Sequence, residues 1–187
     1  MRRLIVGVSG ASGSAYAYRA LQVLRDCKDI ETHLVVSRQA ARTIELETDK
    51  SVKDFEALAD TVYDHDDLAA AISSGSFITE GMLVAPCSMG SASAIAYSLN
   101  ANLLVRAADV CLKERRKLVL MVRETPLHTG HLRTLTQLSE IGAVIMPPLP
   151  ALYAHPKSVD DIIAHGVGKA LDQFGIEHKL FERWSSP

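Results

Sequence analysis

A stretch near the start of the chain, GVSGASG at 7–13, combines glycines with hydroxyl side chains directly after an apolar run. Glycine lets the backbone approach a ligand closely, and hydroxyl groups and helix N-terminal amides bind phosphate. The glycines lie three residues apart, unlike the GxGxxG of dinucleotide sites, and Ser37 stands where those sites carry an acid for the ribose. No GxxxxGK[ST] motif occurs. The pattern therefore favours a mononucleotide that carries a single phosphate.

Small and polar residues also follow other apolar runs that we expect to be strands. These residues are Ser37, Ser88 within 86–89, and Arg123 with Glu124 within 123–126. Ligands of open parallel sheets bind outside the carboxyl ends of the strands, where hydroxyls, small residues and a cation suit a phosphate group. FMN is the commonest mononucleotide cofactor of this architecture, so fold analogy favours FMN.

The elements that must position these residues are alternating strands and helices. Apolar runs predict strands at 3–8, 33–36, 82–85, 118–122 and 143–146. The segments between them predict helices at 14–26, 38–47, 89–99, 102–116, 127–140 and 158–174. Continuous Val, Ile and Leu runs are typical of strands buried on both faces. We expect one three-layer α/β domain over 1–187, Rossmann-like or flavodoxin-like, with a mostly parallel sheet and irregular segments at 48–80 and 146–156.

Composition limits the classes of partner. The 187 residues are 48% hydrophobic with a formal net charge of -2, so we expect one core and no field that attracts nucleic acid. No apolar run approaches the roughly 20 residues of a membrane span, and the run in MRRLIVGV is too short for a signal peptide. The three scattered cysteines suit a reducing compartment. The cytoplasm is the expected location.

Two other kinds of chemistry compete with the nucleotide interpretation. Cys87 precedes a predicted helix, where a thiol can become a nucleophile, but a buried small side chain is the favoured interpretation. His128, His131 and the DHDD sequence at 64–67 offer metal ligands. A metal site needs three or four converging ligands, so a helix cap and a surface loop are favoured there.

Longer strings in the chain carry a family resemblance. They are PCSMGSASAIA at 86–96, NLLVRAADVCLKERRKLVLMVRETPL at 102–127, PALYAHP at 150–156 and LETD at 46–49, together with GVSGASG. With these strings the chain resembles the flavin prenyltransferases of the UbiX type, from the first predicted strand to LDQFGIEHKLFERW near the C-terminus. The resemblance implies an enzyme that joins a dimethylallyl group, from dimethylallyl phosphate, to N5 and C6 of reduced FMN. It further implies independence of metals, a dodecamer with active sites between subunits, and delivery of the product to a UbiD-type decarboxylase.

The resemblance also implies the site residues. Contacts to FMN are implied for Gly10, Ala11, Ser12, Ser37, Ser88, Met89, Gly90, Ser91 and Arg123. A site for the prenyl phosphate is implied for Arg106, Lys113, Tyr153 and Lys169, with Arg106 supplied by a neighbouring subunit. Catalytic roles are implied for Ser12, Glu47, Lys113 and Glu124, and closure over the prenyl chain for the loop SSGSF at 73–77. Without the resemblance, Arg106 and Lys113 would be assigned to a solvated helix face, and Glu124 equally to an ion pair with Arg123 or Lys113.

The chain departs from the family pattern at several positions. Lys169 stands where the family usually has arginine, which replaces a bidentate phosphate contact by a point charge. Gly90 and Ser91 stand in place of lysine and threonine, and PALY stands in place of PAFY. Two alternatives stay open: an FMN-dependent decarboxylase and a non-catalytic flavin carrier. The related decarboxylases of cysteinyl substrates typically use a histidine after the first helix, and residues 9–32 contain none.

Overall fold

A six-stranded, all-parallel sheet forms the centre of the computed structural model, which describes residues 1–183. The strands are β1 (Arg2–Val8), β2 (Ile30–Val36), β3 (Thr61–Tyr63), β4 (Gly81–Cys87), β5 (Lys117–Val122) and β6 (Ala143–Ile145). They lie in the order β3-β2-β1-β4-β5-β6. The predicted α/β class with a parallel sheet is confirmed.

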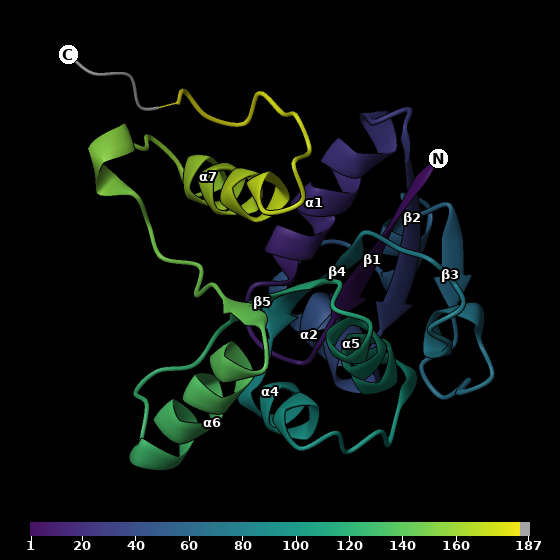
Figure 1. Cartoon of the computed structure of the whole chain (residues 1–187). Helices are drawn as coiled ribbons and strands as arrows, with labels where there is room; N and C mark the ends of the chain where they lie inside the picture. The colour runs from purple at the N-terminus through teal and green to yellow at the C-terminus, as the bar shows by residue number, and fades with distance from the viewer. Residues whose placement is uncertain (184–187) are drawn as a thin grey trace.

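Helices cover both faces of this sheet (Figure 1). They are α1 (Ser14–Asp26), α2 (Arg38–Glu47), α3 (Val52–Glu56), α4 (Met89–Ala96), α5 (Leu103–Lys113), α6 (Thr129–Glu140) and α7 (Val159–Asp172), with 3₁₀ turns η1 (Ala71–Ser73) and η2 (Leu152–Ala154). α1, α2 and α7 pack on one face, and α4, α5 and α6 pack on the other. Within residues 1–183, no helix is both long and apolar enough to cross a bilayer.

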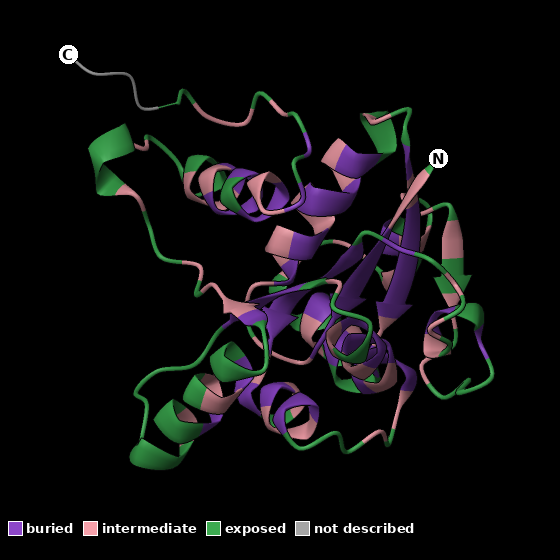
Figure 2. Ribbon diagram, viewed as in Figure 1, coloured by how far each residue is buried: buried purple, intermediate pink, exposed green. Residues whose placement is uncertain are grey.

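The apolar runs build two cores, one on each side of the sheet. Leu4, Val6 and Val8 of β1 contribute to the core under α1 and α7, while Ile5 contributes to the core under α4 and α5. β4 is buried along its whole length, as Figure 2 shows for the central strands in purple. Each fully buried aliphatic side chain contributes about 2 kcal/mol to folding. Burial on both faces explains why these strands carry continuous rather than alternating apolar residues.

Four helices, α4, α5, α6 and α7, are shorter than the sequence predicts, and the reason is clear for α4 and α5. The predicted helix 89–99 ends as α4 at Ala96, because Ser98 has a φ of 51°, which an α-helix does not continue. The predicted helix 102–116 begins after its cap, since the side chain of Asn102 accepts a hydrogen bond from the Val105 amide at 3.0 Å. It ends before Arg115, whose φ is 57°. The predicted positions of both helices are otherwise confirmed.

The point where the strand order reverses lies between β1 and β4. Without the short edge strand β3, the remaining strands have the flavodoxin-type order, and β3 extends it to the order of dinucleotide-binding folds. Both orders place a crevice at the carboxyl ends of β1 and β4, where helices leave the sheet in opposite directions. The segments 9–13, 86–89 and 123–126 all lie at this edge, because each follows one of the central strands.

Candidate functional site

A cleft of about 250 Å³ lies at this carboxyl edge. It is lined by Gly10 from the turn after β1, by His65 from the loop after β3, and by residues in or next to the first turns of α2, α4 and α5. The N-terminal end of an α-helix carries a partial positive charge and amides without intrahelical partners. Convergence of these three N-termini on one cleft builds a site for an anion such as a phosphate.

Two serines fix the helix N-termini at the cleft. The hydroxyl oxygen of Ser37 accepts a hydrogen bond from the Ala40 amide at 3.1 Å, and that of Ser88 accepts one from the Ser91 amide at 3.1 Å. Ser88 Oγ also donates to Ser91 Oγ at 3.1 Å. Each cap engages one amide and leaves earlier amides of the same turn for a ligand. The structure thus brings the predicted residues Ser37, Ser88 and Ser91 to one cleft.

Two glycines, Gly10 and Gly90, line the cleft and have different surroundings. A Cβ added at Gly10 would come within 2.3 Å of Gln39 Cβ, so the turn after β1 can lie against α2 only with glycine there. A Cβ at Gly90 would meet only Ser88 Oγ at 3.9 Å, so this position opens into free space. Small residues on two sides of a hydroxyl-lined cleft fit a bulky phosphate ester such as FMN.

Ser9 joins the two strands that flank the crevice. Its buried hydroxyl donates a hydrogen bond to the Pro86 carbonyl at 2.9 Å and accepts one from the Ser88 amide at 2.7 Å. The turn after β1 is therefore fixed directly to the end of β4, where α4 begins.

Glu47 lies at the N-terminus of α1, next to Ser12. Its Oε2 accepts hydrogen bonds from the Gly13 amide at 2.9 Å and from the Ser14 amide at 3.4 Å. Burial raises the pKa of Glu47, but hydrogen bonds from the Ser12 side chain and from Gly13 and Ser14 together outweigh it, so the net pKa is lowered. The structure brings the predicted catalytic residues Ser12 and Glu47 together, with Glu47 ionised at neutral pH.

Arg123 and Glu124 follow β5 and are both exposed. The Arg123 amide donates to the Cys87 carbonyl at 3.0 Å, which places Arg123 beside the end of β4. Glu124 accepts a hydrogen bond from the Thr125 amide at 3.1 Å. Within residues 1–183, Glu124 forms no ion pair with Arg123 or Lys113.

The α5 cations lie against the loop SSGSF. Arg106 donates from Nε to the Ser73 carbonyl at 3.1 Å and pairs with Asp109 at 3.1 Å, while Lys113 pairs with Glu114. Arg116 also holds this loop, by hydrogen bonds to the carbonyls of residues 75 and 77 at 2.6 and 2.7 Å. The loop and the α5 cations therefore form one group.

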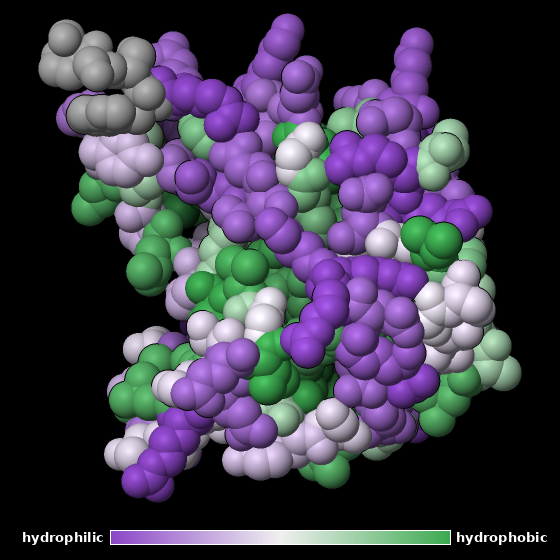
Figure 3. Space-filling model, viewed as in Figure 1, coloured by the Kyte–Doolittle hydropathy of each residue, from purple (hydrophilic) through white to green (hydrophobic). Residues whose placement is uncertain are grey.

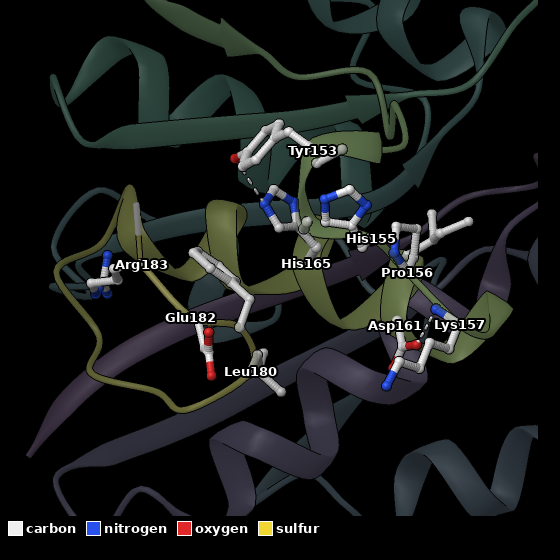
Figure 4. A pocket seen from close by; sticks show the side chains of 13 residues that line it. Tyr153, His155, Pro156, Lys157, Asp161, His165, Leu180, Glu182 and Arg183 are labelled. Carbon is white, nitrogen blue, oxygen red and sulfur yellow. Dashed lines mark hydrogen bonds between the residues drawn. The ribbon is translucent and has the colours of Figure 1, made fainter. Parts of the chain in front are cut away.

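Tyr153 and Lys169 belong to a second group on the opposite face. Tyr153 lines a hollow of about 510 Å³ between η2, α7 and residues 180–183, and its hydroxyl lies 3.2 Å from His165 Nε2 (Figure 4). Lys169, one turn after His165 on α7, lines an adjacent hollow of about 260 Å³. Its Nζ lies 4.0 Å from Oδ2 of Asp172. One chain by itself therefore does not bring together the four side chains predicted for the prenyl phosphate.

The competing candidates have structural roles. Cys87 is fully buried, and burial raises the pKa of its thiol to about 12, so it is no nucleophile. His128 caps α6 by accepting from the amides of residues 130 and 131 at 3.0 and 3.3 Å. No cluster of metal ligands occurs within the described part of the chain.

His65 is a cleft residue that the nucleotide argument from the sequence missed. It follows β3, which is three residues long and too short to be predicted from its apolar pattern. Had β3 been predicted, the position of His65 after a strand would have indicated a ligand-binding residue, as it does for Ser37 and Ser88.

Comparison with known proteins places this geometry in a family. The family model described as Flavoprotein matches residues 1–171. The chain is 60% identical over 186 residues to "Flavin prenyltransferase UbiX" of Escherichia coli (strain K12), covering 98% of both proteins, and 57% identical to the protein of that name from Thauera aromatica, covering 98% of this chain and 94% of the other.

Solved structures give the same assignment. The structure titled "AnUbiX (PadA1) in complex with FMN and dimethylallyl pyrophosphate" has a TM-score of 0.97 at 46% identity, covering 99% of this chain and 98% of the other. A dodecameric "FMN-dependent Ubix-like Decarboxylase" from Escherichia coli O157:H7 has a TM-score of 0.96 at 51% identity, covering 98% and 100%. Because the similarity extends over the full length of the chain and agrees with the cleft at the carboxyl edge, the chain belongs to the UbiX family of flavin prenyltransferases, within the flavoproteins.

Proposed function

We propose that this protein transfers a dimethylallyl group from dimethylallyl phosphate to N5 and C6 of reduced FMN, and that the product serves a UbiD-type decarboxylase. The observation that carries the proposal is the cleft of about 250 Å³ on which three helix N-termini and the predicted serines converge, in a chain 60% identical to a flavin prenyltransferase. The reduced flavin supplies the nucleophilic nitrogen and carbon. The protein supplies binding, orientation and proton transfer.

The residues proposed to bind FMN are Gly10, Ala11, Ser12, Ser37, Ser88, Met89, Gly90, Ser91 and Arg123. Of these, Gly10, Ser37, Ser88, Gly90 and Ser91 line the cleft. The caps and first-turn amides of α2 and α4 would hold the phosphate, and Gly10 would give close backbone approach. Arg123, which forms no ion pair within the described residues, would extend over the flavin.

The prenyl phosphate is proposed to bind between subunits. Arg106 and Lys113 lie on one face of the sheet and Tyr153 and Lys169 on the other, so a second copy of the chain would complete the cationic site. Cations there stabilise the charge that develops on the leaving phosphate as its bond to the allylic carbon breaks.

Exposed apolar residues support this assembly. Leu149 and Leu152 are 73% and 69% exposed on the segment between β6 and α7. Figure 3 shows a face hollowed beside this segment, with hydrophobic residues in green. Large side chains on an extended segment favour burial by a neighbouring subunit.

Glu47 is proposed as the proton acceptor, with Ser12 hydrogen-bonded to it. The ionised carboxylate can take a proton that leaves the flavin when its new bonds form. The exposed Glu124 is the other proposed acid or base at this edge.

Anaerobic incubation with reduced FMN and dimethylallyl phosphate tests the activity. We expect the bound flavin to gain the mass of one prenyl unit, and a parallel reaction with the diphosphate identifies the donor. An unchanged flavin on protein that binds FMN would support a non-catalytic carrier and overturn the proposal.

Replacing Lys169 by alanine is expected to raise the KM for dimethylallyl phosphate by about tenfold, because a phosphate contact to a cation is lost. The affinity for FMN should stay within about twofold of the original value, since Lys169 lies away from the cleft. Steady-state kinetics and FMN titration measure the two effects. Equal losses in both would contradict the assignment of Lys169 to the prenyl phosphate.

A further inference from the structure

His65 lies at the wall of the cleft, and its ring Nδ1 has no hydrogen-bond partner among the described residues 1–183. Its carbonyl accepts a hydrogen bond from the Leu103 amide at 2.8 Å, which fixes the loop after β3 to the N-terminus of α5. The imidazole ring lines the cleft, and its Nδ1 is buried without a hydrogen-bond partner. A polar atom buried without a partner is costly, so its retention beside an anion-binding cleft points to a ligand.

Among the described residues that line the cleft, no titratable side chain other than His65 occurs. The others are small, amide, hydroxyl or aliphatic, so within this set His65 alone can become a cation. The charged groups near it are Asp64 and Asp66 on its own loop and Arg38 on α2. Asp66 forms an ion pair with Arg38, and Asp64 accepts a hydrogen bond from the Asp66 amide at 2.8 Å. These groups are therefore largely engaged with one another.

We propose that His65 binds the phosphate group of FMN in this protein, donating a hydrogen bond to it as the imidazolium. The inference rests on the proposed function, because it takes the cleft to be the phosphate end of the FMN site. The proton comes from solvent, since a dianion at the cleft favours the charged ring. His65 would then add the cationic contact that the capped helices and serines do not provide.

The pH dependence of this contact has a definite direction. In the protein without ligand, burial lowers the pKa of His65, so the ring is neutral at pH 7. The phosphate dianion raises that pKa in the complex. The added affinity is therefore fully present below the pKa of the free protein and is lost as the pH rises through the pKa of the complex.

His65→Gln, which keeps a hydrogen-bond donor but no charge, tests the proposal. Titration with FMN and with riboflavin, which lacks the phosphate, is followed by flavin fluorescence at about pH 6 and pH 8, on either side of the usual histidine pKa. We expect roughly tenfold weaker FMN binding at the lower pH, a smaller loss at the higher pH, and unchanged riboflavin binding. His131→Gln is the matched control, because His131 also has a buried, unpartnered Nδ1 but is not among the cleft residues.

A second measurement uses the unmodified protein and does not depend on how the variant folds. The NMR titration of the His65 ring should show a higher pKa with FMN than with riboflavin. Equal weakening of both ligands in His65→Gln, or a His65 pKa that FMN leaves unchanged, would overturn the inference while the proposed function stands. Failure of the unmodified protein to bind FMN at all would overturn both.

Discussion

Replacing Glu47 by glutamine is expected to slow FMN prenylation by about 10²- to 10⁴-fold, the usual contribution of a general acid or base. Glutamine has nearly the same shape, and its carbonyl oxygen can still accept the 2.9 Å hydrogen bond from the Gly13 amide. The N-terminus of α1 and the binding of FMN should therefore be preserved. Single-turnover reactions under anaerobic conditions, read out by flavin mass, measure the rate, and fluorescence titration measures FMN affinity.

Glu45→Gln is the matched control for this substitution. Glu45 lies on the same helix but pairs with Arg42 at 3.1 Å on the exposed surface, so its loss should leave the rate unchanged. A full rate in Glu47→Gln, or a loss of FMN affinity as large as the loss of rate, would contradict a role in proton transfer.

The lowered pKa of Glu47 also fixes the direction of its pH effects. Its carboxylate persists as the pH falls through the ordinary carboxyl range of ~4–5. The stabilisation that it gives to the N-terminus of α1 is fully present above the ordinary pKa and is lost as the pH falls through the lowered one. Thermal unfolding of the Glu47→Gln variant and of the unmodified protein should therefore converge only in strong acid.

Replacing Gly81 by alanine is expected to destabilise the fold by about 3 kcal/mol or more, the cost of a clash combined with backbone strain. Gly81 begins β4 with a φ of 143°, and an added Cβ would come within 2.0 Å of the Lys117 carbonyl oxygen on β5. That oxygen belongs to the neighbouring strand and cannot move without disturbing the pairing of Gly81 with Lys117. Urea denaturation without flavin, at one fixed protein concentration, measures the loss.

Gly142→Ala separates strain from clash. Gly142 also has a positive φ, 106°, but a Cβ there would meet nothing within 4 Å. Its replacement should therefore cost only about 1 kcal/mol, from backbone strain alone. Equal destabilisation by the two substitutions would show that the contact with Lys117 contributes nothing.

Most of the fold was predictable because its signals are local and strong. β1, β4 and β5 carry apolar runs, and two of the helices begin at the N-caps Ser37 and Ser88. α3 and β3 were not predicted, because five- and three-residue elements give no clear periodicity. β3 is defined by pairing with residues 33–35 of β2, which is a tertiary interaction.

The candidate site was predictable to a different degree in each part. Ser37 and Ser88 were found because a parallel sheet brings its strand ends to one edge. The link between Ser12 and Glu47 was suggested only by family resemblance, since no spacing rule joins a turn after β1 to the end of α2. The separation of Arg106 from Tyr153 across the sheet could not be predicted from composition or periodicity, because it depends on which face each helix covers.

The hydroxyl of Ser9 has a mechanical consequence for the crevice. Because it bonds at once to the Pro86 carbonyl and the Ser88 amide, the ends of β1 and β4 cannot spread apart without breaking both bonds. The floor of the crevice is therefore rigid. Any widening that admits a flavin must come from movement of the surrounding loops. In hydrogen exchange, the Ser88 amide should be among the slowest at this edge of the sheet, opening only with the whole molecule.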